Sequence, residues 1–472
     1  ITGRVGSLEN SADIVRQAAE MISAGEVEQG QITKTVAVID EAQDMDENEF
    51  ALIKALMERN EDMRIIAVGD DDQNIYEFRN SSSAHMASLI TEYGAAHYSM
   101  TDNYRSARRI VALANAYAAR ITHRLKDEPI RAVKNVDGVV KLIKHAARNM
   151  DIPAADCLQA TWHGGTAAIL TNTNEDALRM LGLLTNRGIP ARLIQSGDGF
   201  RMSQLAEVKM FCKLLKAESA DDSPIIPESA WSSARERLRG GMYADSACLE
   251  TVLNMLAKFE EVSNGALYRS DFETFIFESS YETFTPQEQD AVTISTIHKA
   301  KGREFDNVYL MLNQSDDSTD EERRKIYVGI TRAKNELYVH YNGAIFDDIS
   351  ADGAEHESDT QDYPEPDELE MQLGMKDVFL DFFIGKKADV FKLKSGDELE
   401  IRGDFLYANG KRLVIPSNAV REKLAGLRER GYIPYRAQVN FIVEWVKKET
   451  GESAAVILPD IRLRRRLHND GA

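Results

Sequence analysis

The sequence predicts a parallel α/β fold that carries a short helical insertion and ends in a small β-rich module. Three observations lead to this prediction. Short apolar runs alternate with helical patterns over residues 36–69 and again from residue 166 onward, which is typical of a parallel sheet. Residues 218–290 interrupt the second series with mostly helical patterns. From residue 376 onward, turn signals separate runs of strand-forming residues.

The first α/β series begins with the apolar run at residues 36–40, which predicts a buried parallel strand that ends in a carboxylate. Asp46 and Glu49 have the spacing of a capping box, so we expect a helix to start there. Residues 65–69 repeat the strand pattern and again lead into acidic residues. A strand, a helix and a second strand in this order predict a parallel pair.

The second α/β series resumes after the insertion, and its elements follow from the same patterns. Gly188 marks the end of its first helix. The predicted strands are residues 167–170, 189–194, 292–297, 307–312 and 336–341, and the predicted helices are residues 175–187 and 322–334.

The C-terminal module is expected to be a small barrel of SH3-like or Tudor-like type. Asn409-Gly410 lies between two runs of strand formers and predicts a hairpin turn, and residues 438–445 alternate as a strand does. A helix capped by Ser417 or Asn418 is expected to end at Gly431.

Composition limits the class of protein. The chain has 472 residues and 43% hydrophobic content, enough for two or three domains. No run approaches the roughly 18 apolar residues of a membrane span, and no secretion signal precedes the first strand, so we expect a cytoplasmic protein without a membrane partner. Cys157, Cys212 and Cys248 lack disulfide or metal-ligand spacing, which favours buried thiols.

The formal charge of −20 is unfavourable for a nucleic-acid binder, whose affinity depends largely on basic groups. Much of the excess acid lies between Asp347 and Glu370, a stretch broken by Pro364 and Pro366, which we interpret as a solvated linker. Residues 462–466 form an arginine-rich patch that suits contact with DNA or a protein partner, and a solvated terminus is the open alternative.

Candidate catalytic carboxylates follow the first predicted strand. Asp40 and Glu41 are adjacent at the end of that strand, where open α/β sheets place their ligands. The first can hold Mg²⁺, directly or through water, while the second positions and deprotonates an attacking water. The alternative is a polar helix start, since acidic residues are common there.

The segment after the second strand combines an amide with aromatic and basic side chains. Gln73 is suited to sensing a terminal phosphate, whereas Tyr76, Phe78 and Arg79 offer stacking faces and a cation to an unpaired nucleic-acid strand. Taken singly, such aromatic residues more often belong to a core.

Two arginines are candidates for phosphate contacts. Arg105 follows Tyr104 ahead of a helix, and Arg332 lies in the run Tyr-Val-Gly-Ile-Thr-Arg-Ala at 327–333. If both reach a γ-phosphate across a domain gap they act as arginine fingers, although arginines are ordinarily surface residues. Between them, Thr296 and His298 lie in a turn after a strand and offer a hydroxyl and an imidazole to nucleic-acid phosphates.

Five motifs in register carry a resemblance to a known family. They are Asp-Glu-Ala-Gln-Asp at 40–44, Gly-Asp-x-x-Gln-x-Ile-Tyr-x-Phe-Arg at 69–79, Asn-Tyr-Arg-Ser at 103–106, Thr-x-His-x-x-Lys-Gly-x-Glu-Phe at 296–305 and Tyr-Val-Gly-x-Thr-Arg-Ala at 327–333. Together they resemble the successive motifs of the UvrD/Rep/PcrA-type helicases of superfamily one, over about residues 36–341.

The resemblance implies two RecA-like P-loop NTPase core domains, the first incomplete, with ATP in the cleft between them. It implies an ATP hydrolase that moves along single-stranded or partially duplex DNA, 3′ to 5′, in DNA repair, replication or recombination. The alternative is a helicase-like module that binds nucleic acid or a partner protein without turnover, and a helicase-nuclease subunit has little support because the sequence shows no nuclease metal cluster.

The resemblance also implies roles for individual residues. The nucleotide roles are Asp40 as the Mg²⁺ ligand, Glu41 as the catalytic base, Gln73 as the γ-phosphate contact, Arg105 and Arg332 as arginine fingers, Tyr104 packing on the adenine, and Glu304 contacting the nucleotide. The positions that touch the DNA strand are Tyr76, Phe78, Arg79, Thr296 and His298.

Three features depart from the family pattern. Asn80 stands where the family usually has Gly, and Arg303 replaces an aliphatic residue and could add a phosphate contact. The insertion is much shorter than the family's second accessory domain. No G-x-x-x-x-G-K-[ST] phosphate loop occurs, so we expect this chain alone to hydrolyse ATP poorly or not at all. Because the chain starts at Ile1 shortly before its first strand, we interpret it as part of a longer protein.

These inferences give an expected domain order. The expected segments are a partial first core domain (1–100), a second core domain in two parts (101–217 and 291–343), a reduced accessory insertion (218–290), an acidic linker (344–375) and the β-rich module (376–472).

Overall fold

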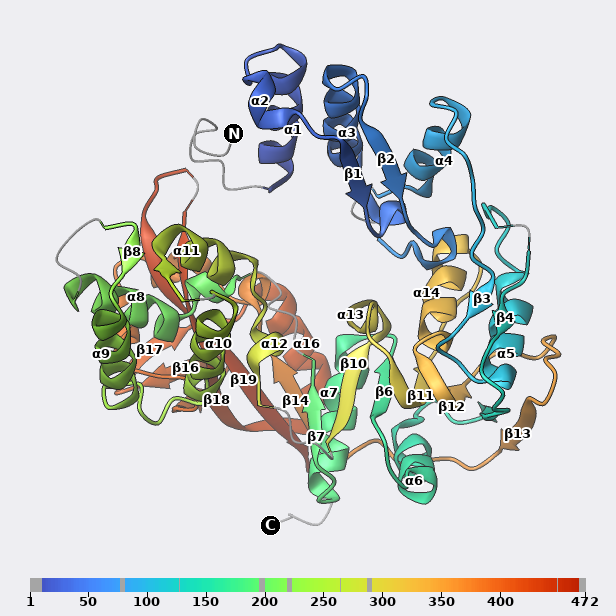
Figure 1. The fold of residues 1–472 in the computed structure, drawn as a ribbon. Helices are drawn as coiled ribbons and strands as arrows, with labels where there is room; N and C mark the ends of the chain where they lie inside the picture. The colour runs from blue at the N-terminus through green and yellow to red at the C-terminus, as the bar shows by residue number, and fades with distance from the viewer. Residues whose placement is uncertain are drawn as a thin grey trace. The chain divides into compact units, whose positions relative to one another are not determined.

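The computed structural model describes residues 11–76, 81–126, 128–194, 200–218, 223–263, 265–286, 291–447 and 449–466 (Figure 1). The chain divides into two compact units, each built from two separated stretches of sequence. Unit 1 consists of residues 1–172 and 296–363, and unit 2 consists of residues 173–295 and 364–472. Every helix among the described residues is too short or too polar to cross a membrane.

Unit 1 opens with a parallel strand pair and its flanking helices. The elements are α1 (Ser11–Ser23), α2 (Gln29–Ile32), β1 (Val36–Ile39), α3 (Glu47–Arg59), β2 (Arg64–Ala67) and α4 (Ser83–Thr91). β1 and β2 pair in parallel, with Val36 opposite Arg64. At the start of α3 the Glu49 backbone N–H donates to the Asp46 carboxylate at 2.9 Å, and the Asp46 N–H donates to Glu49 at 3.0 Å. The predicted capping box is therefore confirmed.

One face of the β1–β2 pair is open to solvent. Val36, Val38, Ile66 and Val68 are 46%, 66%, 51% and 46% exposed. The opposite face packs on a small core around Phe50. The first strand and its parallel pairing are confirmed, but the prediction that this strand is buried is wrong, because no described element covers its outer face.

Five strands of the large parallel sheet belong to unit 1. They are β5 (Val139–His145), β6 (Ala167–Thr171), β11 (Phe305–Leu312), β12 (Ala333–Tyr341) and β13 (Glu355–Asp359). They lie in the order β13-β5-β12-β11-β6, and each neighbouring pair is parallel. The other elements are β3 (Asp102–Asn103), α5 (Arg108–Ala118), β4 (Arg131–Ala132), α6 (Asp151–Thr161), α13 (Ile297–Ala300) and α14 (Asp320–Ile330). β6 is buried along its whole length, as a strand of a sheet covered on both faces should be.

The acidic stretch contributes strands that the sequence pattern does not predict. β13 pairs with β5 within unit 1, where Lys141 of β5 forms ion pairs with Glu355 and Glu357. Further along, residues 368–372 form β14, a strand of unit 2. The interpretation of this stretch as a bare linker fails at both places, because cations on neighbouring strands offset the acidic side chains.

Unit 2 combines an α/β part, a helical segment and an antiparallel sheet (Figure 1). The first two parts contain α7 (Asn174–Asn186), β7 (Ala191–Leu193), α8 (Ala206–Glu218), β8 (Ile225–Ile226), α9 (Glu228–Arg239), α10 (Leu249–Val262), β9 (Leu267–Tyr268), α11 (Arg269–Glu278), α12 (Tyr281–Phe284) and β10 (Val292–Thr296). β7 and β10 pair in parallel. The predicted helical character of the insertion is confirmed.

The third part is a six-stranded antiparallel sheet in the order β14-β19-β18-β15-β16-β17. Its elements are β14 (Glu368–Gln372), α15 (Lys387–Val390), β15 (Glu398–Arg402), β16 (Phe405–Ala408), β17 (Lys411–Val414), α16 (Asn418–Glu429), β18 (Tyr432–Val446) and β19 (Ser453–Arg465). β18 and β19 are the long red strands of Figure 1.

Local signals in this sheet act as predicted. Asn409 and Gly410 have φ of +51° and +74° in the turn between β16 and β17, which is why these two residue types are needed there. Ser417 caps α16, and Gly431 follows it at φ +90°. Residues 462–465, by contrast, are part of β19 rather than a solvated terminus.

The three cysteines are unpaired, as their spacing predicts. Cys248 is buried, and Cys157 and Cys212 are half-buried. Burial raises the pKa of the Cys248 thiol to about 12 and that of the other two thiols to about 11. They are consequently poor nucleophiles at neutral pH.

A buried carboxyl group lies inside the core that the helical segment and the antiparallel sheet share. Glu207 of α8 is fully buried and accepts hydrogen bonds from the Ser246 hydroxyl at 2.5 Å and the Ser395 hydroxyl at 3.3 Å. Its Oε2 atom has no partner among the described residues. Burial raises the pKa of Glu207, so the folded protein retains a proton that the unfolded chain releases.

Glu207→Gln should therefore stabilise the protein at alkaline but not at acidic pH. Below the ordinary carboxyl pKa of 4.5, Glu207 is protonated in both the folded and the unfolded wild-type protein. Above that pH only the unfolded chain ionises at this residue, so the free energy of unfolding of the wild type falls as pH rises. The fall ends once the pH passes the raised pKa of the folded state. Urea unfolding should show that the variant has a free energy of unfolding roughly 1–3 kcal/mol higher than the wild type at high pH. A pH-independent difference would contradict this account.

Candidate active site

The first candidate catalytic pair lies where β1 ends. The Glu41 backbone N–H donates to Asp40 Oδ1 at 3.0 Å, and both side chains are exposed. Glu41 has φ +50° and ψ +42°, the left-handed conformation that non-glycine residues seldom adopt. Such strain persists only where neighbouring contacts hold it, and it is common at functional sites.

Gln43 provides that contact. Its amide nitrogen donates to Glu41 Oε2 at 2.6 Å, and its Oε1 accepts from the Asp70 backbone N–H at 2.9 Å. The side chain is fully buried. Gln43 thus ties the end of β1 to the end of β2. A Cβ atom at Gly69 would lie 2.4 Å from Gln43 Oε1, so only glycine leaves room for this amide.

The second candidate group, Gln73, lies in the turn after β2 and contacts a candidate arginine finger. Its amide nitrogen donates to Asp70 Oδ2 at 2.7 Å, and its Oε1 accepts from the Arg332 guanidinium at 2.8 Å. Residues 73 and 332 are far apart in sequence, and the structure brings them into direct contact.

Arg332 is an almost completely buried cation, 1% exposed. Its other hydrogen bonds go to the Val328 carbonyl, the Arg303 carbonyl and the Thr331 hydroxyl, at 2.9, 3.2 and 3.0 Å. Burial, followed by the nearby Arg105 charge, lowers the pKa of Arg332 to about 10. Among the described residues, every hydrogen-bond acceptor of this guanidinium is neutral.

Arg105 lies beside the same site. Its Nε is 2.5 Å from Glu304 Oε2, and its guanidinium also donates to the Thr331 carbonyl at 3.4 Å. Lys334 is 2.9 Å from the other Glu304 oxygen, and its hydrogen bond is the main cause that lowers the pKa of Glu304. The preceding Tyr104 is 70% exposed, so its ring is accessible to a ligand.

Lys301 links the two strand ends to the nucleic-acid candidates. Its ammonium group lies 2.5 Å from Asp44, donates to the Gln73 carbonyl at 2.8 Å, and stands 5.0 Å from the centre of the Tyr76 ring. Burial raises the pKa of Asp44, and the Lys301 hydrogen bond opposes that effect.

Tyr76, His298 and Thr296 lie close together. The Tyr76 hydroxyl donates to the His298 carbonyl at 3.3 Å, and the two rings are 6.4 Å apart. Thr296 caps α13 by accepting from the Lys299 N–H at 3.4 Å. Phe78 and Arg79, like Asn80, lie outside the described residues.

The predicted nucleotide residues therefore gather in unit 1: Gln73 contacts Arg332, Arg105 contacts Glu304, and the Glu41 charge acts on Arg332. The sequence did not assign roles to Gln43, Lys301 or Lys334. Gln43 and Lys301 lie inside two of the five motifs, so their positions there could have marked them as site residues. Lys334 had none.

Asp40 has the donor chemistry of the magnesium ligand that the sequence predicts at this strand end. Its carboxylate is exposed at the strand end, where Oδ1 accepts a hydrogen bond from the Glu41 backbone N–H. Asp44, by comparison, is occupied by Lys301. An exposed carboxylate at this edge matches the hard oxygen donors that Mg²⁺ prefers.

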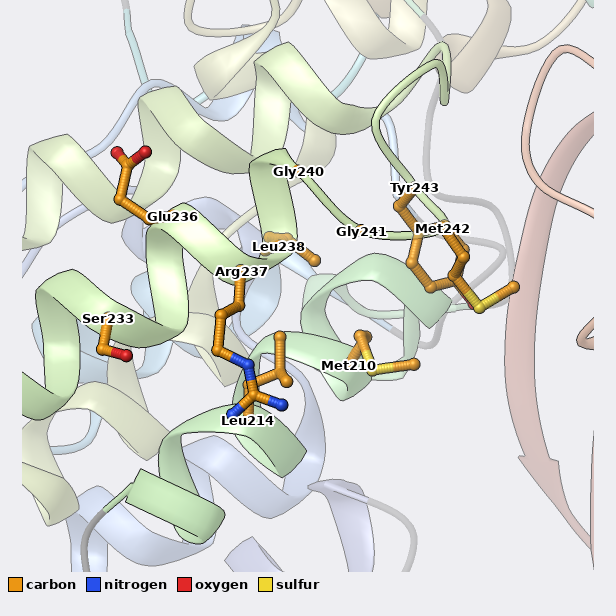
Figure 2. Close-up of a pocket in the computed structure, with 10 residues that line it drawn as sticks. All are labelled: Met210, Leu214, Ser233, Glu236, Arg237, Leu238, Gly240, Gly241, Met242 and Tyr243. Carbon is orange, nitrogen blue, oxygen red and sulfur yellow. The ribbon is translucent and has the colours of Figure 1, made fainter.

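A separate cavity of about 530 Å³ lies in unit 2 between α8, α9 and the turn after α9 (Figure 2). Met210, Leu214 and Leu238 line it, and the Arg237 side chain lies among them. Arg237 pairs with Glu218 at 2.5 Å. None of the predicted nucleotide or DNA residues that the structure describes lines this cavity.

Two protein-family models match the chain. The model of the UvrD/REP helicase N-terminal domain matches residues 11–94, which include Asp40 and Gln73. The model of the UvrD-like helicase C-terminal domain matches residues 230–344, which include Arg332.

The curated relatives are described as ATP-dependent DNA helicases. Rep of Buchnera aphidicola is 24% identical, over 64% of this chain and 62% of that protein. Rep of Escherichia coli is 22% identical, over 64% and 59%, and UvrD2 of Mycobacterium tuberculosis is 25% identical, over 64% and 46%. The match thus spans less than two thirds of each relative. A solved C-terminal domain of a possible DNA helicase from Lactobacillus matches 54% of this chain and 98% of that chain at 14% identity, with a TM-score of 0.28 that is too low to bear on the fold.

Gly69→Ala should destabilise unit 1, because its Cβ would collide with the Gln43 amide and strain the link between Glu41 and Asp70. The expected loss in free energy of unfolding is roughly 1–3 kcal/mol. Gly182→Ala in α7 is the matched control: its Cβ meets nothing within 4 Å, and helix propensity predicts a gain of about 0.5–1 kcal/mol. Equal effects of the two substitutions in urea unfolding would refute the clash.

Proposed function

The chain belongs to the UvrD/Rep/PcrA-type helicases, and from this premise we propose that it is the ATP-hydrolysing, DNA-translocating part of an ATP-dependent DNA helicase. The fold proposed for this role is a pair of RecA-like domains with the nucleotide between them. The proposed movement is 3′ to 5′ along single-stranded DNA, in repair, replication or recombination.

The contact between Arg332 and Gln73 is the observation that carries this proposal. Among the described residues this buried guanidinium has only neutral acceptors, so it is poorly compensated, and an anionic ligand such as a terminal phosphate would satisfy it better. Gln73 is the acceptor nearest to the β2 strand end, where open α/β sheets bind ligands. The pair is therefore suited to exchange its mutual hydrogen bond for contacts with a γ-phosphate.

The remaining residues fill the roles of a phosphoryl-transfer site. Asp40 would hold Mg²⁺, which would neutralise negative charge on the β- and γ-phosphate oxygens of ATP. Glu41 orients and deprotonates the attacking water, and its left-handed backbone fixes the direction of its carboxylate. Arg105 stabilises developing charge beside Arg332, and Tyr104 packs on the adenine, with Glu304 contacting the nucleotide.

The phosphate loop is proposed to come from a segment that packs beside β1. Val36, Val38, Ile66 and Val68 expose a contiguous apolar face at the strands that lead to Asp40 and Gln73. Apolar faces of this kind mark interaction surfaces. The sequence contains no loop of the required type, so the cradle for the β- and γ-phosphates has to be supplied beside this face.

The DNA strand is proposed to cross Tyr76, Thr296 and His298. Phe78 and Arg79, which lie outside the described residues, are proposed as DNA contacts from their motif positions alone. Tyr76 is half-buried against Lys301 and the α13 segment, so its ring is held in place. Because Lys301 also donates to the Gln73 carbonyl, a strand that moves Tyr76 would act on the nucleotide turn directly.

The absence of a phosphate loop from the sequence favours a second candidate function, a helicase-like module that binds nucleic acid or a partner without turnover. The carboxylates, Gln73 and both arginines weigh against it, because a module without turnover has no chemical need for the whole set.

Glu41→Gln should abolish single-strand-stimulated ATP hydrolysis in the protein that includes the phosphate loop, while leaving nucleotide binding intact. The amide keeps the shape but cannot take a proton, so a loss of at least about a hundredfold in turnover is expected. Glu47→Gln, at an exposed position in the first turn of α3, is the control. Unchanged turnover in Glu41→Gln would refute the assignment.

Tyr76→Ala should weaken single-stranded DNA binding by about tenfold, since a stacked base contributes roughly 1–3 kcal/mol. Fluorescence anisotropy with a labelled oligonucleotide measures the affinity. Tyr98→Ala removes a ring that is 85% exposed and lies outside the five motifs, and it should leave binding unchanged. Equal affinities of the two variants would exclude Tyr76 from the DNA surface.

A further inference from the structure

Three consecutive carboxylates form the turn that carries Gln73. Asp70, Asp71 and Asp72 follow β2, and their ligand oxygens lie within 4.8 Å of one another. Asp71 is 2% exposed and Asp72 is fully buried. Buried carboxylates this close repel one another, and burial raises the pKa of Asp71 although a backbone hydrogen bond from Leu125 opposes the effect. The turn therefore needs compensation from outside its own segment.

Three consecutive residues of a distant segment supply that compensation. Arg124 donates to both oxygens of Asp72, at 2.8 and 2.7 Å, and the Leu125 backbone N–H donates to Asp71 at 2.5 Å. Lys126 lies 2.5 Å from Asp70 and 3.5 Å from Asp72. The hydrogen bond with Asp72 raises the pKa of Arg124. We call residues 124–126 together with residues 70–72 the carboxylate clamp.

The clamp leads directly to the orientation of Gln73. Lys126 engages Asp70 Oδ1, Asp70 Oδ2 accepts from the Gln73 amide nitrogen at 2.7 Å, and Gln73 Oε1 then accepts from Arg332 at 2.8 Å. An amide side chain has one donating and one accepting end, so fixing its nitrogen on Asp70 turns its oxygen toward Arg332. Asp70 thereby sets which end of Gln73 faces the site, and Lys126 holds the other oxygen of the Asp70 carboxylate.

The neighbouring helix reinforces this arrangement. Tyr327 of α14 is buried close to Asp70 and Asp72, whose charges contribute to its raised pKa. Arg324 of α14 donates to the His123 carbonyl at 3.1 Å, just before the clamp. Since α14 runs directly into Arg332, the clamp and the guanidinium are attached to the same element. The two cations and the backbone N–H also explain the acidic cluster without a bound metal ion.

We propose that Lys126 and Arg124 are positioning residues for the γ-phosphate contact: Arg124 anchors the turn through Asp72, and Lys126 orients the Gln73 amide through Asp70. This inference rests on the proposed function, because it assigns Gln73 to a terminal phosphate. It adds two residues that lie outside the five motifs.

The test uses the protein that includes the phosphate loop and compares affinities for ATPγS and ADP, each with Mg²⁺, by displacement of a fluorescent nucleotide. In Lys126→Met the ratio of ATPγS affinity to ADP affinity should fall by about tenfold, because a hydrogen bond to a charged group contributes about that factor. The ratio should then approach that of Gln73→Ala. Lys126→Arg keeps a cation near Asp70 and should retain most of it. Lys141→Met, which breaks only the ion pairs with Glu355 and Glu357, is the matched control. A general loss of folding would lower both affinities together rather than their ratio.

Asp70→Asn provides a second variant that leaves no cavity, and it should lose the same preference. Amide hydrogen exchange without nucleotide should also be faster at residues 70–74 in Lys126→Met than in Lys141→Met. Full ATPγS preference in both Lys126→Met and Asp70→Asn, alongside its loss in Gln73→Ala, overturns the clamp. Failure of every variant and of the wild type to bind nucleotide overturns the proposed function instead, and unchanged exchange at residues 70–74 then overturns the clamp separately.

Discussion

The burial of the Arg332 guanidinium is the constraint on which the rest of this site depends. A fully charged group with neutral acceptors is costly to bury, and the fold accepts it by surrounding the group with carbonyls, a hydroxyl and the Gln73 amide oxygen. Each acceptor fixes one donor direction, so the guanidinium is held in a single orientation. The Gln73 contact is the one that joins this arrangement to the turn after β2.

In the proposed motor, both arginines hold partners that a nucleotide can replace. Arg105 is paired with Glu304 in a partly exposed ion pair, which contributes little net stability because water screens it. Arg332 is paired with a neutral amide. A triphosphate offers both groups stronger, charged acceptors, so its binding energy can be used to rearrange the elements that carry them. Both arginines therefore have hydrogen-bond partners in this structure, but these partners contribute less stability than a triphosphate would.

The sequence predicted most elements to within a few residues and failed where burial or pairing depends on distant segments. β1 has the composition of a buried strand, yet its outer face is exposed, because composition does not reveal which elements are present to cover it. β13 was missed because acidic side chains disfavour a strand unless cations such as Lys141 lie opposite. In the same way, motif spacing located Gln73 and Arg332 but gave no means of pairing Arg124 with Asp72, which are brought together only by folding.

The left-handed backbone at Glu41 shows how these contacts combine. The strain there has to be maintained by the surroundings, and the Gln43 amide does so by binding the Glu41 carboxylate at one end and the Asp70 backbone at the other. Asp70 in turn holds Gln73 through its side chain. A continuous chain of hydrogen bonds therefore runs from Gln73 through Asp70 and Gln43 to the carboxylate of Glu41. Gln73, proposed to sense the terminal phosphate, and Glu41, proposed to activate water, thus belong to one hydrogen-bonded network. In the proposed mechanism this network couples binding of the terminal phosphate to the position of the water that attacks it.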